Sequence, residues 1–210
     1  MEKNLFSKLN LYDQIGYLMV GTIGSLLLVF DLTFFYKREI PTFNLNTILI
    51  WIIVVYFTGH LIHGFSNLIS NLPILRFLIK ENKTDFSNQE KEALKEAEKY
   101  FGLEKQDEDK LWNLCYIFAS AKDITGQVQS FNAYYGLYRG WLLVFLFQSL
   151  FLLYWLLLAY SAKILIMFIA SMLIILVFYK RTRRFWTYLR SKTLETFIVM
   201  KEEKRGGYNN

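Results

Sequence analysis

Cysteine and histidine are scarce in this sequence, and their scarcity limits its chemistry. The 210 residues include one cysteine, Cys115, and two histidines. One cysteine excludes an internal disulfide and a cysteine-only metal site, and two histidines are too few for the usual structural zinc sites. We therefore expect no metal and no cofactor.

Catalytic motifs are missing as well. The sequence has no phosphate-binding loop, no zinc-protease motif, no G-x-S-x-G and no paired aspartates in an apolar segment. Cys115 lies on the apolar face of a predicted helix, a position typical of core packing and not of a nucleophile. We expect no catalytic residues and no enzymatic activity.

Charge is scarce in four long segments of a chain that is 54% hydrophobic: the first segment holds one charged residue, Asp31, and the other three hold none. A helix of about 20 apolar residues crosses a bilayer, so these segments predict an all-α membrane protein with four transmembrane helices. The first is too long for a signal-peptide core and lacks a cleavage site, so we expect it to be retained. The predicted spans are 16–36, 47–69, 141–160 and 164–179.

Lysine and arginine are distributed unevenly between the two sides of these spans. With the N-terminus inside, the inner segments carry 21 of the 24 basic residues and the outer loops carry three. Basic residues accumulate on the cytoplasmic side of membrane proteins. We therefore expect a multi-pass protein of the bacterial inner membrane, with both termini in the cytoplasm and the lipid bilayer as its main partner.

The spans divide the chain into four parts. Residues 1–69 form an N-terminal transmembrane hairpin, 70–139 a helical cytoplasmic segment, 140–180 a second transmembrane hairpin, and 181–210 a basic cytoplasmic helix and tail. The third and fourth helices are expected to extend inward and to complete a helical cytoplasmic module.

Helix signals are clear in the segment between the two hairpins. Ser87 and Glu90 have the spacing of a capping box, which predicts a helix over 88–101 that ends at Gly102. The stretch 72–80 is expected to continue the second span or to lie on the membrane surface. Further helices are predicted to begin at Asp107 and Asp123, and apolar faces for packing are predicted at Ala93, Leu94, Ala97, Phe101, Leu111, Leu114, Cys115 and Phe118.

Three polar residues near the predicted spans are candidates for an ion pathway or its gate. His60 and His63 share one helix face near the inner surface; metal binding, pH sensing, gating and plain hydrogen bonding all remain open for them. Asp31 is the only acid inside a span, where a charge is costly unless paired. It is either functional, for example in a ring of carboxylates that favours cations, or simply reaches water or Lys37.

Arg139 stands where the third helix enters the membrane. It is expected to anchor the helix at the headgroups or to pair with a polar group on the second helix, near His60. Two pairs of small residues, Gly136 with Gly140 and Gly21 with Ser25, are spaced for close helix contact.

The net charge of +6 is concentrated after the fourth span, which predicts contact with anionic lipid headgroups. A phosphate or oligonucleotide site is the alternative, and we expect no reading of duplex DNA. Arg183, Arg184 and Tyr188 are the candidate ligand-binding or headgroup-binding residues. Asn132 and Gln127 are either part of a pocket with the two arginines or members of a solvated face.

Three motifs resemble a group of small bacterial four-helix membrane proteins. They are YFTGHLIH at 56–63, FNAYYGLYR at 131–139 and RFWTYL at 184–189. Some of these proteins look like membrane effectors of phage-defence loci, including the membrane partner of Hailong-type systems. The resemblance implies a homo-oligomeric, channel-like effector that responds to a nucleotide or oligonucleotide made by a partner enzyme. His60, Arg139, Arg184 and Tyr188 correspond in position only.

Three hypotheses for function follow. The first is a channel-like effector gated by a cytoplasmic signal. The second is a non-conducting anchor or adaptor that binds a partner protein through its cytoplasmic helices. The third is a membrane enzyme that uses His60 and His63.

Overall fold

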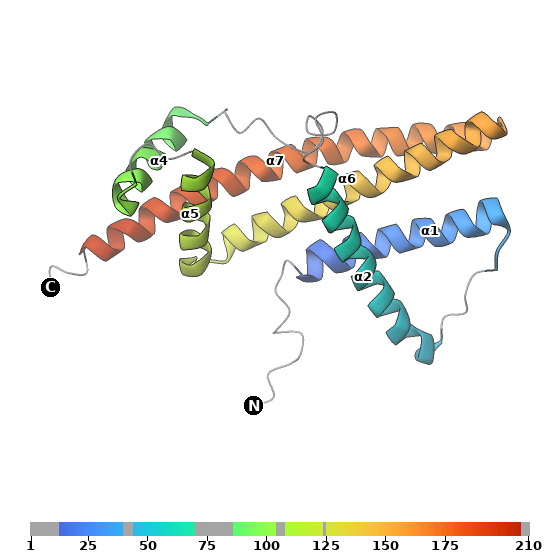
Figure 1. Ribbon diagram of the computed structural model, residues 1–210, viewed down its shortest axis with the longest axis horizontal. Coiled ribbons are helices and arrows are strands. Elements are labelled where there is room, and N and C mark those ends of the chain that lie inside the picture. The colour runs from blue at the N-terminus through green and yellow to red at the C-terminus, as the bar shows by residue number, and fades with distance from the viewer. Residues whose placement is uncertain (1–12, 40–43, 70–85, 104–107, 124, 207–210) are drawn as a thin grey trace.

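A computed structural model describes residues 13–39, 44–69, 86–103, 108–123 and 125–206 (Figure 1). In these ranges the chain is helical and contains no strand, as the sequence predicts. The elements are a π-helix (η2, Asp13–Met19) and the α-helices α1 (Val20–Tyr36), α2 (Leu45–Ile69), α4 (Asn88–Phe101), α5 (Glu108–Lys122), α6 (Gln127–Leu158) and α7 (Ala162–Gly206).

Four of these helical stretches are long and apolar enough to cross a membrane. Two of them, Gly16–Tyr36 and Thr47–Ile69, coincide with the predicted first and second spans. The other two belong to α6 and α7, which extend well beyond the predicted third and fourth spans. The predicted all-α architecture with four membrane-spanning candidates is therefore confirmed.

The predicted end of the third span is wrong by two residues. Helix α6 ends at Leu158, and Tyr160, which was assigned to the span, lies in the connection to α7. Ala159 donates its backbone N–H to Trp155 O but is itself extended, with φ −146°. Ser161 O already accepts the N–H of Leu165. The chain therefore reverses within residues 159–161.

The hairpin of α6 and α7 forms the long axis of the molecule (Figure 1). Helix α7 has 45 residues and runs without a break from its apolar first half into its basic second half. The sequence boundary near residue 180 is thus a change in composition within one continuous helix. The apolar half of α7 and its basic half thus share one uninterrupted helical backbone.

Helix α1 lies along α6, and α2 crosses α1 steeply near the start of α1 (Figure 1). Glycines permit this crossing: a Cβ on Gly21 would overlap the carbonyl oxygen of Val55, and one on Gly59 would overlap that of Tyr17. The predicted small pair of Gly21 and Ser25 marks a real contact, and its partner on α2 is Gly59.

Helices α4 and α5 pack against the second half of α7, and we call this assembly the α4–α5–α7 module (Figure 1). The predicted capping box is present: Ser87 Oγ accepts the N–H of Glu90, and Glu90 accepts the N–H of Ser87. Gly102 ends α4 at φ 65°, as predicted. The buried core of the module consists of Phe86, Leu94, Ala97, Leu111, Cys115, Leu194 and Phe197.

Asp123 fixes the start of α6, close to its predicted role. Its carboxylate accepts the N–H groups of Thr125 and Val128, at 3.0 and 2.7 Å. The N-cap position itself is Gly126, with φ 67°. The expected helix or surface segment at 72–80 and the expected helix start at Asp107 lie outside the described residues.

The thiol of Cys115 gives a direct probe of this core. Cys115 is fully buried, and burial raises its pKa to about 12. Because the thiolate is the reactive form, we expect negligible reaction with maleimide at pH 8 in the native protein and rapid reaction once the module opens. Rapid labelling of the folded protein would contradict this packing. The rate is measured by mass spectrometry of the intact chain.

Candidate functional site

Asp31 of α1 and Gln148 of α6 face each other inside the bundle of apolar helices. The amide Nε2 of Gln148 donates to Asp31 Oδ1 at 2.8 Å, and each residue is only 8% exposed. The alternative that Asp31 pairs with Lys37 is wrong, because the Lys37 ammonium lies over the ring of Phe34 instead. Asp31 is therefore a paired, buried group.

Apolar layers enclose this polar pair on both sides. The ring of Phe35, one turn beyond Asp31, meets Phe151, one turn beyond Gln148, edge-on at 5.2 Å. It also stacks at 4.9 Å on Trp155, about two turns beyond Gln148. One turn back, Leu27 and Val144 belong to a separate apolar cluster. Asp31 and Gln148 thus form a polar layer between two apolar clusters.

Several serines add polar atoms to the buried faces of the same helices. Ser171 Oγ of α7 donates to Phe145 O of α6 at 3.1 Å, next to the layer of Asp31 and Gln148. Ser149 Oγ donates to Leu146 O within α6. Ser25 Oγ is buried and has no hydrogen-bond partner. The polar side chains of α1, α6 and α7 in this region thus turn inward.

The two histidines meet Tyr17 of the π-helix. The ring of His60 stacks on Tyr17, with centroids 3.8 Å apart, and the His63 ring approaches Tyr17 edge-on at 5.0 Å. The Nε2–H of His63 donates to the carbonyl of Gly16 at 3.0 Å. A π-helix is rare and is frequent at functional sites. Here it presents a carbonyl to the buried histidine.

Arg139 reaches from α6 to α2, which is the second of the two alternatives left open by the sequence. Its Nη2 donates to Asn67 Oδ1 at 2.9 Å. Asn67 follows His63 by one helical turn, so arginine and histidines form one polar cluster at this end of α2. The Nε of Arg139 is buried without a partner, which leaves one donor of this cluster unused.

The predicted candidates therefore separate into distinct places. Asp31 lies about 20 Å along the helix axis from Gly16, the residue that binds His63. Among the described residues, no three histidine, cysteine, aspartate or glutamate side chains group as metal ligands. Sequence reasoning missed Gln148 and Asn67; the only signal was a lone amide in or beside an apolar segment.

The candidate arginines after the fourth span lie on the surface of α7. Arg184 Nε donates to the hydroxyl of Tyr188 at 2.7 Å, and Arg183 Nη1 donates to that of Tyr179 at 3.4 Å. Asn132, which was considered for a pocket with these arginines, interacts with the Tyr116 hydroxyl of α5 instead. Of the two alternatives left open for Asn132, a pocket with the arginines is therefore not favoured.

A shallow groove lies between α4 and α7, apart from these sites. Its volume is about 360 Å³. The floor is largely apolar, and the carboxylates at its edge come from Glu90 and Glu195. The lining residues are Ser87, Gln89, Glu90, Ala93, Ser191, Leu194, Glu195, Ile198 and Val199.

Comparisons of the chain with protein-family models, curated proteins and solved structures give no match.

Proposed function

We propose that the protein is an inner-membrane effector that forms or gates an ion pathway under the control of its α4–α5–α7 module. The buried layer of Asp31 and Gln148 carries this proposal. A helix that only anchors a protein needs no carboxylate in its apolar stretch, and a buried intramembrane acid is costly unless it has a role. The inward serines beside it extend the polar surface that an ion would need.

The two apolar layers around Asp31 suit a closed resting state. Ions do not cross a dry hydrophobic constriction, and pores gated in this way open when such a constriction widens and is wetted. A small separation of α1 from α6 would part Phe35 from Phe151 and Trp155. Water would then reach the polar layer from the side of Phe35.

Control by the module follows from the continuity of α6 and α7. Helix α7 ends in the module, and α6 begins beside it, where Val128 packs against Ala119 of α5 and Leu189 of α7. Both helices carry residues of the polar layer or its neighbours, such as Gln148 and Ser171. Coupling between distant sites requires an element with two arrangements that a signal biases. We propose the α6–α7 hairpin as that element.

The orientation of the protein in the membrane, its oligomeric state and its biological role belong to the same proposal. The basic second half of α7 supports a cytoplasmic module and cytoplasmic termini. The steeply crossing α2 leaves much of its apolar surface to lipid or to further copies of the chain, so we propose a homo-oligomer. The three short sequence motifs favour phage defence as the setting and a nucleotide or oligonucleotide as the signal.

Replacement of Asp31 by asparagine tests the role of the carboxylate. The asparagine side chain would retain a hydrogen-bonding group for Gln148 but lose the charge. We therefore expect cation flux into proteoliposomes to fall about tenfold or more when Asp31→Asn is added to Glu90→Gln, the change that should release α4 and open the pathway. Glu39→Gln is the matched control, since Glu39 is an exposed carboxylate just beyond the end of the same helix. Equal flux from both variants would remove Asp31 from the pathway.

The groove between α4 and α7 favours an adaptor as the second candidate function. Its apolar floor with acidic edges suits a helix of a partner protein. An adaptor would tolerate Asp31→Asn in every assay but lose its partner when Ile198 or Val199 of the groove is replaced by a charged residue. The Asp31→Asn experiment thus separates the two candidates.

A further inference from the structure

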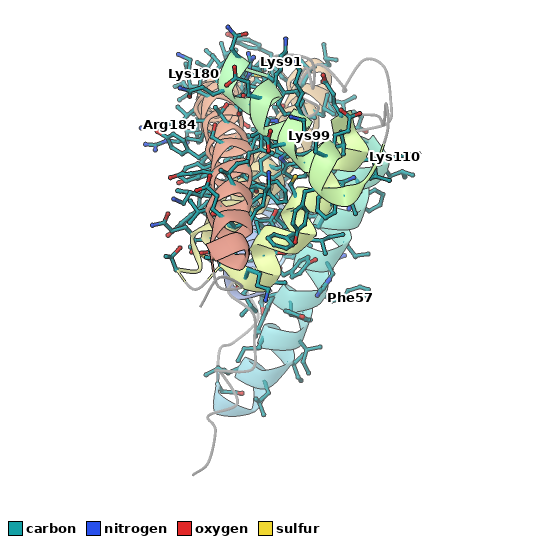
Figure 2. The ribbon with its side chains drawn as sticks, turned by 90° about the vertical axis from the view of Figure 1, so that its left-hand side faces the viewer. Phe57, Lys91, Lys99, Lys110, Lys180 and Arg184 are labelled. Carbon is teal, nitrogen blue, oxygen red and sulfur yellow. The ribbon has the colours of Figure 1, made fainter. Side chains whose placement is uncertain are left out.

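One flank of α7 carries basic side chains that no carboxylate neutralises. Lys180, Arg181 and Arg184 are exposed and lie within about one helical turn of one another. None of the three forms an ion pair among the described residues, and the first acid on α7 is Glu195. Figure 2 shows Lys180 and Arg184 on the same side of α7, away from Lys99 of α4 and Lys110 of α5.

Like charges three and four residues apart on a helix repel each other. Lys180 and Arg184 have the spacing i, i+4, and Arg181 and Arg184 the spacing i, i+3. An anion bound between them would convert this repulsion into attraction. The acid-free sequence of α6 supplies no such anion from the neighbouring helix.

The Arg184 guanidinium is held in place from one side. The hydroxyl of Tyr188 accepts a hydrogen bond from Arg184 Nε at 2.7 Å, and the guanidinium carbon lies 5.3 Å from the centre of the Tyr188 ring. Tyr188 is itself fixed, because its ring contacts Phe131 at 5.7 Å and Phe185 at 5.9 Å. The N–H groups on the two Nη atoms remain available, in the planar arrangement that binds two phosphate oxygens at once.

We propose that Lys180, Arg181 and Arg184 form a phosphate-binding site in which Tyr188 orients the Arg184 guanidinium. The ligand is a phosphate group, carried either by an anionic lipid headgroup or by a soluble phosphorylated compound. This site is separate from the layer of Asp31 and Gln148, and its test does not depend on ion conduction.

The height of the site along α7 suits a lipid phosphate. Tyr179 ends the apolar stretch, and Arg184 follows about 7 Å further along the helix axis. The headgroup region on each side of a bilayer is about 5–8 Å thick. Arg190 lies more than one turn further on, beyond that depth, and forms an ion pair with Glu90.

Arg183 provides a matched control on the same turn of α7. Its charge is the same as that of Arg184, and it also lies against a tyrosine, but it points about 100° away round the helix. The Tyr179 hydroxyl accepts from its Nη1, so one of the two atoms that would bind phosphate is already used. Nonspecific attraction to an anionic surface would weaken equally when either arginine is lost. A defined site would weaken much more when Arg184 is lost.

The experiment measures binding to the full-length protein in neutral detergent micelles by native mass spectrometry and by the shift in unfolding temperature. The probes are phosphatidylglycerol, phosphatidylcholine and, at constant ionic strength, inorganic pyrophosphate. We expect phosphatidylglycerol to bind in preference to phosphatidylcholine. Arg184→Gln should weaken its binding about fivefold, Arg183→Gln less than twofold, and Tyr188→Phe to an intermediate degree, because the charge remains but its orientation is lost.

Each outcome decides the proposal. Arg184-dependent binding of phosphatidylglycerol establishes the site with a lipid ligand, and Arg184-dependent binding of pyrophosphate alone establishes it with a soluble one. Equal losses of binding in Arg183→Gln and Arg184→Gln overturn it. So does binding of phosphatidylglycerol and pyrophosphate that is no stronger than that of phosphatidylcholine. If Arg184→Gln fails to fold, Tyr188→Phe decides in its place, since unchanged affinity in that variant contradicts an oriented guanidinium.

Discussion

Replacement of Glu90 by glutamine is expected to release α4 from α7. The Glu90 carboxylate accepts two bonds from Arg190, at 3.0 and 3.1 Å, one from Ser191 Oγ at 3.0 Å and one from the Ser87 backbone at 2.8 Å. Removal of one partner of a buried ion pair leaves the other charge uncompensated and costs about 3 kcal/mol. We therefore expect hydrogen exchange of the α4 amides to accelerate about a hundredfold.

Cys115 gives an independent readout of the same change, because it lies in the module core beneath α4 and should become reactive as α4 is released. Glu92→Gln is the control, since Glu92 is an exposed carboxylate on the same helix. Unchanged exchange and unchanged labelling in Glu90→Gln would show that the pair does not hold α4.

Low pH should also weaken the contact between α4 and α7. Burial of Glu90 favours its neutral form, but hydrogen bonds from the Ser87 backbone and from Arg190 outweigh burial and lower the carboxyl pKa below its ordinary 4.5. A lowered pKa in the folded state stabilises the protein above the unfolded-state pKa, and this stabilisation is lost as the pH falls through the folded-state value. The α4 contact is therefore stable at neutral pH and weakens below about pH 4.5.

Replacement of Gly59 by alanine is expected to force α1 and α2 apart. The added Cβ would overlap backbone atoms of Tyr17, which cannot rotate away as a side chain can. Overpacking against a backbone costs about 3 kcal/mol, and separation would also break the hydrogen bond from His63 to Gly16. We expect a clear fall in the unfolding temperature in detergent, measured by circular dichroism.

Gly64→Ala is a close control for this prediction. Gly64 lies on the same helix, but a Cβ there would meet no atom within 4 Å. Alanine also has a higher helix propensity than glycine, so this variant should unfold at the same temperature or slightly higher. Equal destabilisation by both substitutions would contradict the close crossing at Gly59.

The four helices that are long and apolar enough to cross a membrane were predictable because hydrocarbon imposes a simple requirement. Every backbone polar group must be paired within its own segment, so length and apolar content nearly define a spanning helix. The end of α6 at Leu158 was missed, since Tyr160 is as suitable at a membrane surface as inside a span. The start of α4 was predictable to the residue because the capping box of Ser87 and Glu90 is a local interaction.

The candidate sites were predictable only in part. Asp31 and His63 were found because a polar residue in an apolar helix stands out. Their partners Gln148 and Gly16 were not found, since the pairing depends on how two helices rotate against each other and on a π-helix without a sequence signature. Gly21 was recognised as a contact residue, but only the crossing angle of α2 brings Gly59 to it.

Control of ion passage by the α4–α5–α7 module is the part of the proposed function that an experiment can test most sharply. The most direct test compares cation flux through proteoliposomes containing the wild-type protein or Glu90→Gln, at equal protein density. With the closed polar layer described above, we predict low flux for the wild type and a severalfold increase when α4 is released. Equal flux from the two proteins, or no flux from either, would contradict the claim and favour the adaptor.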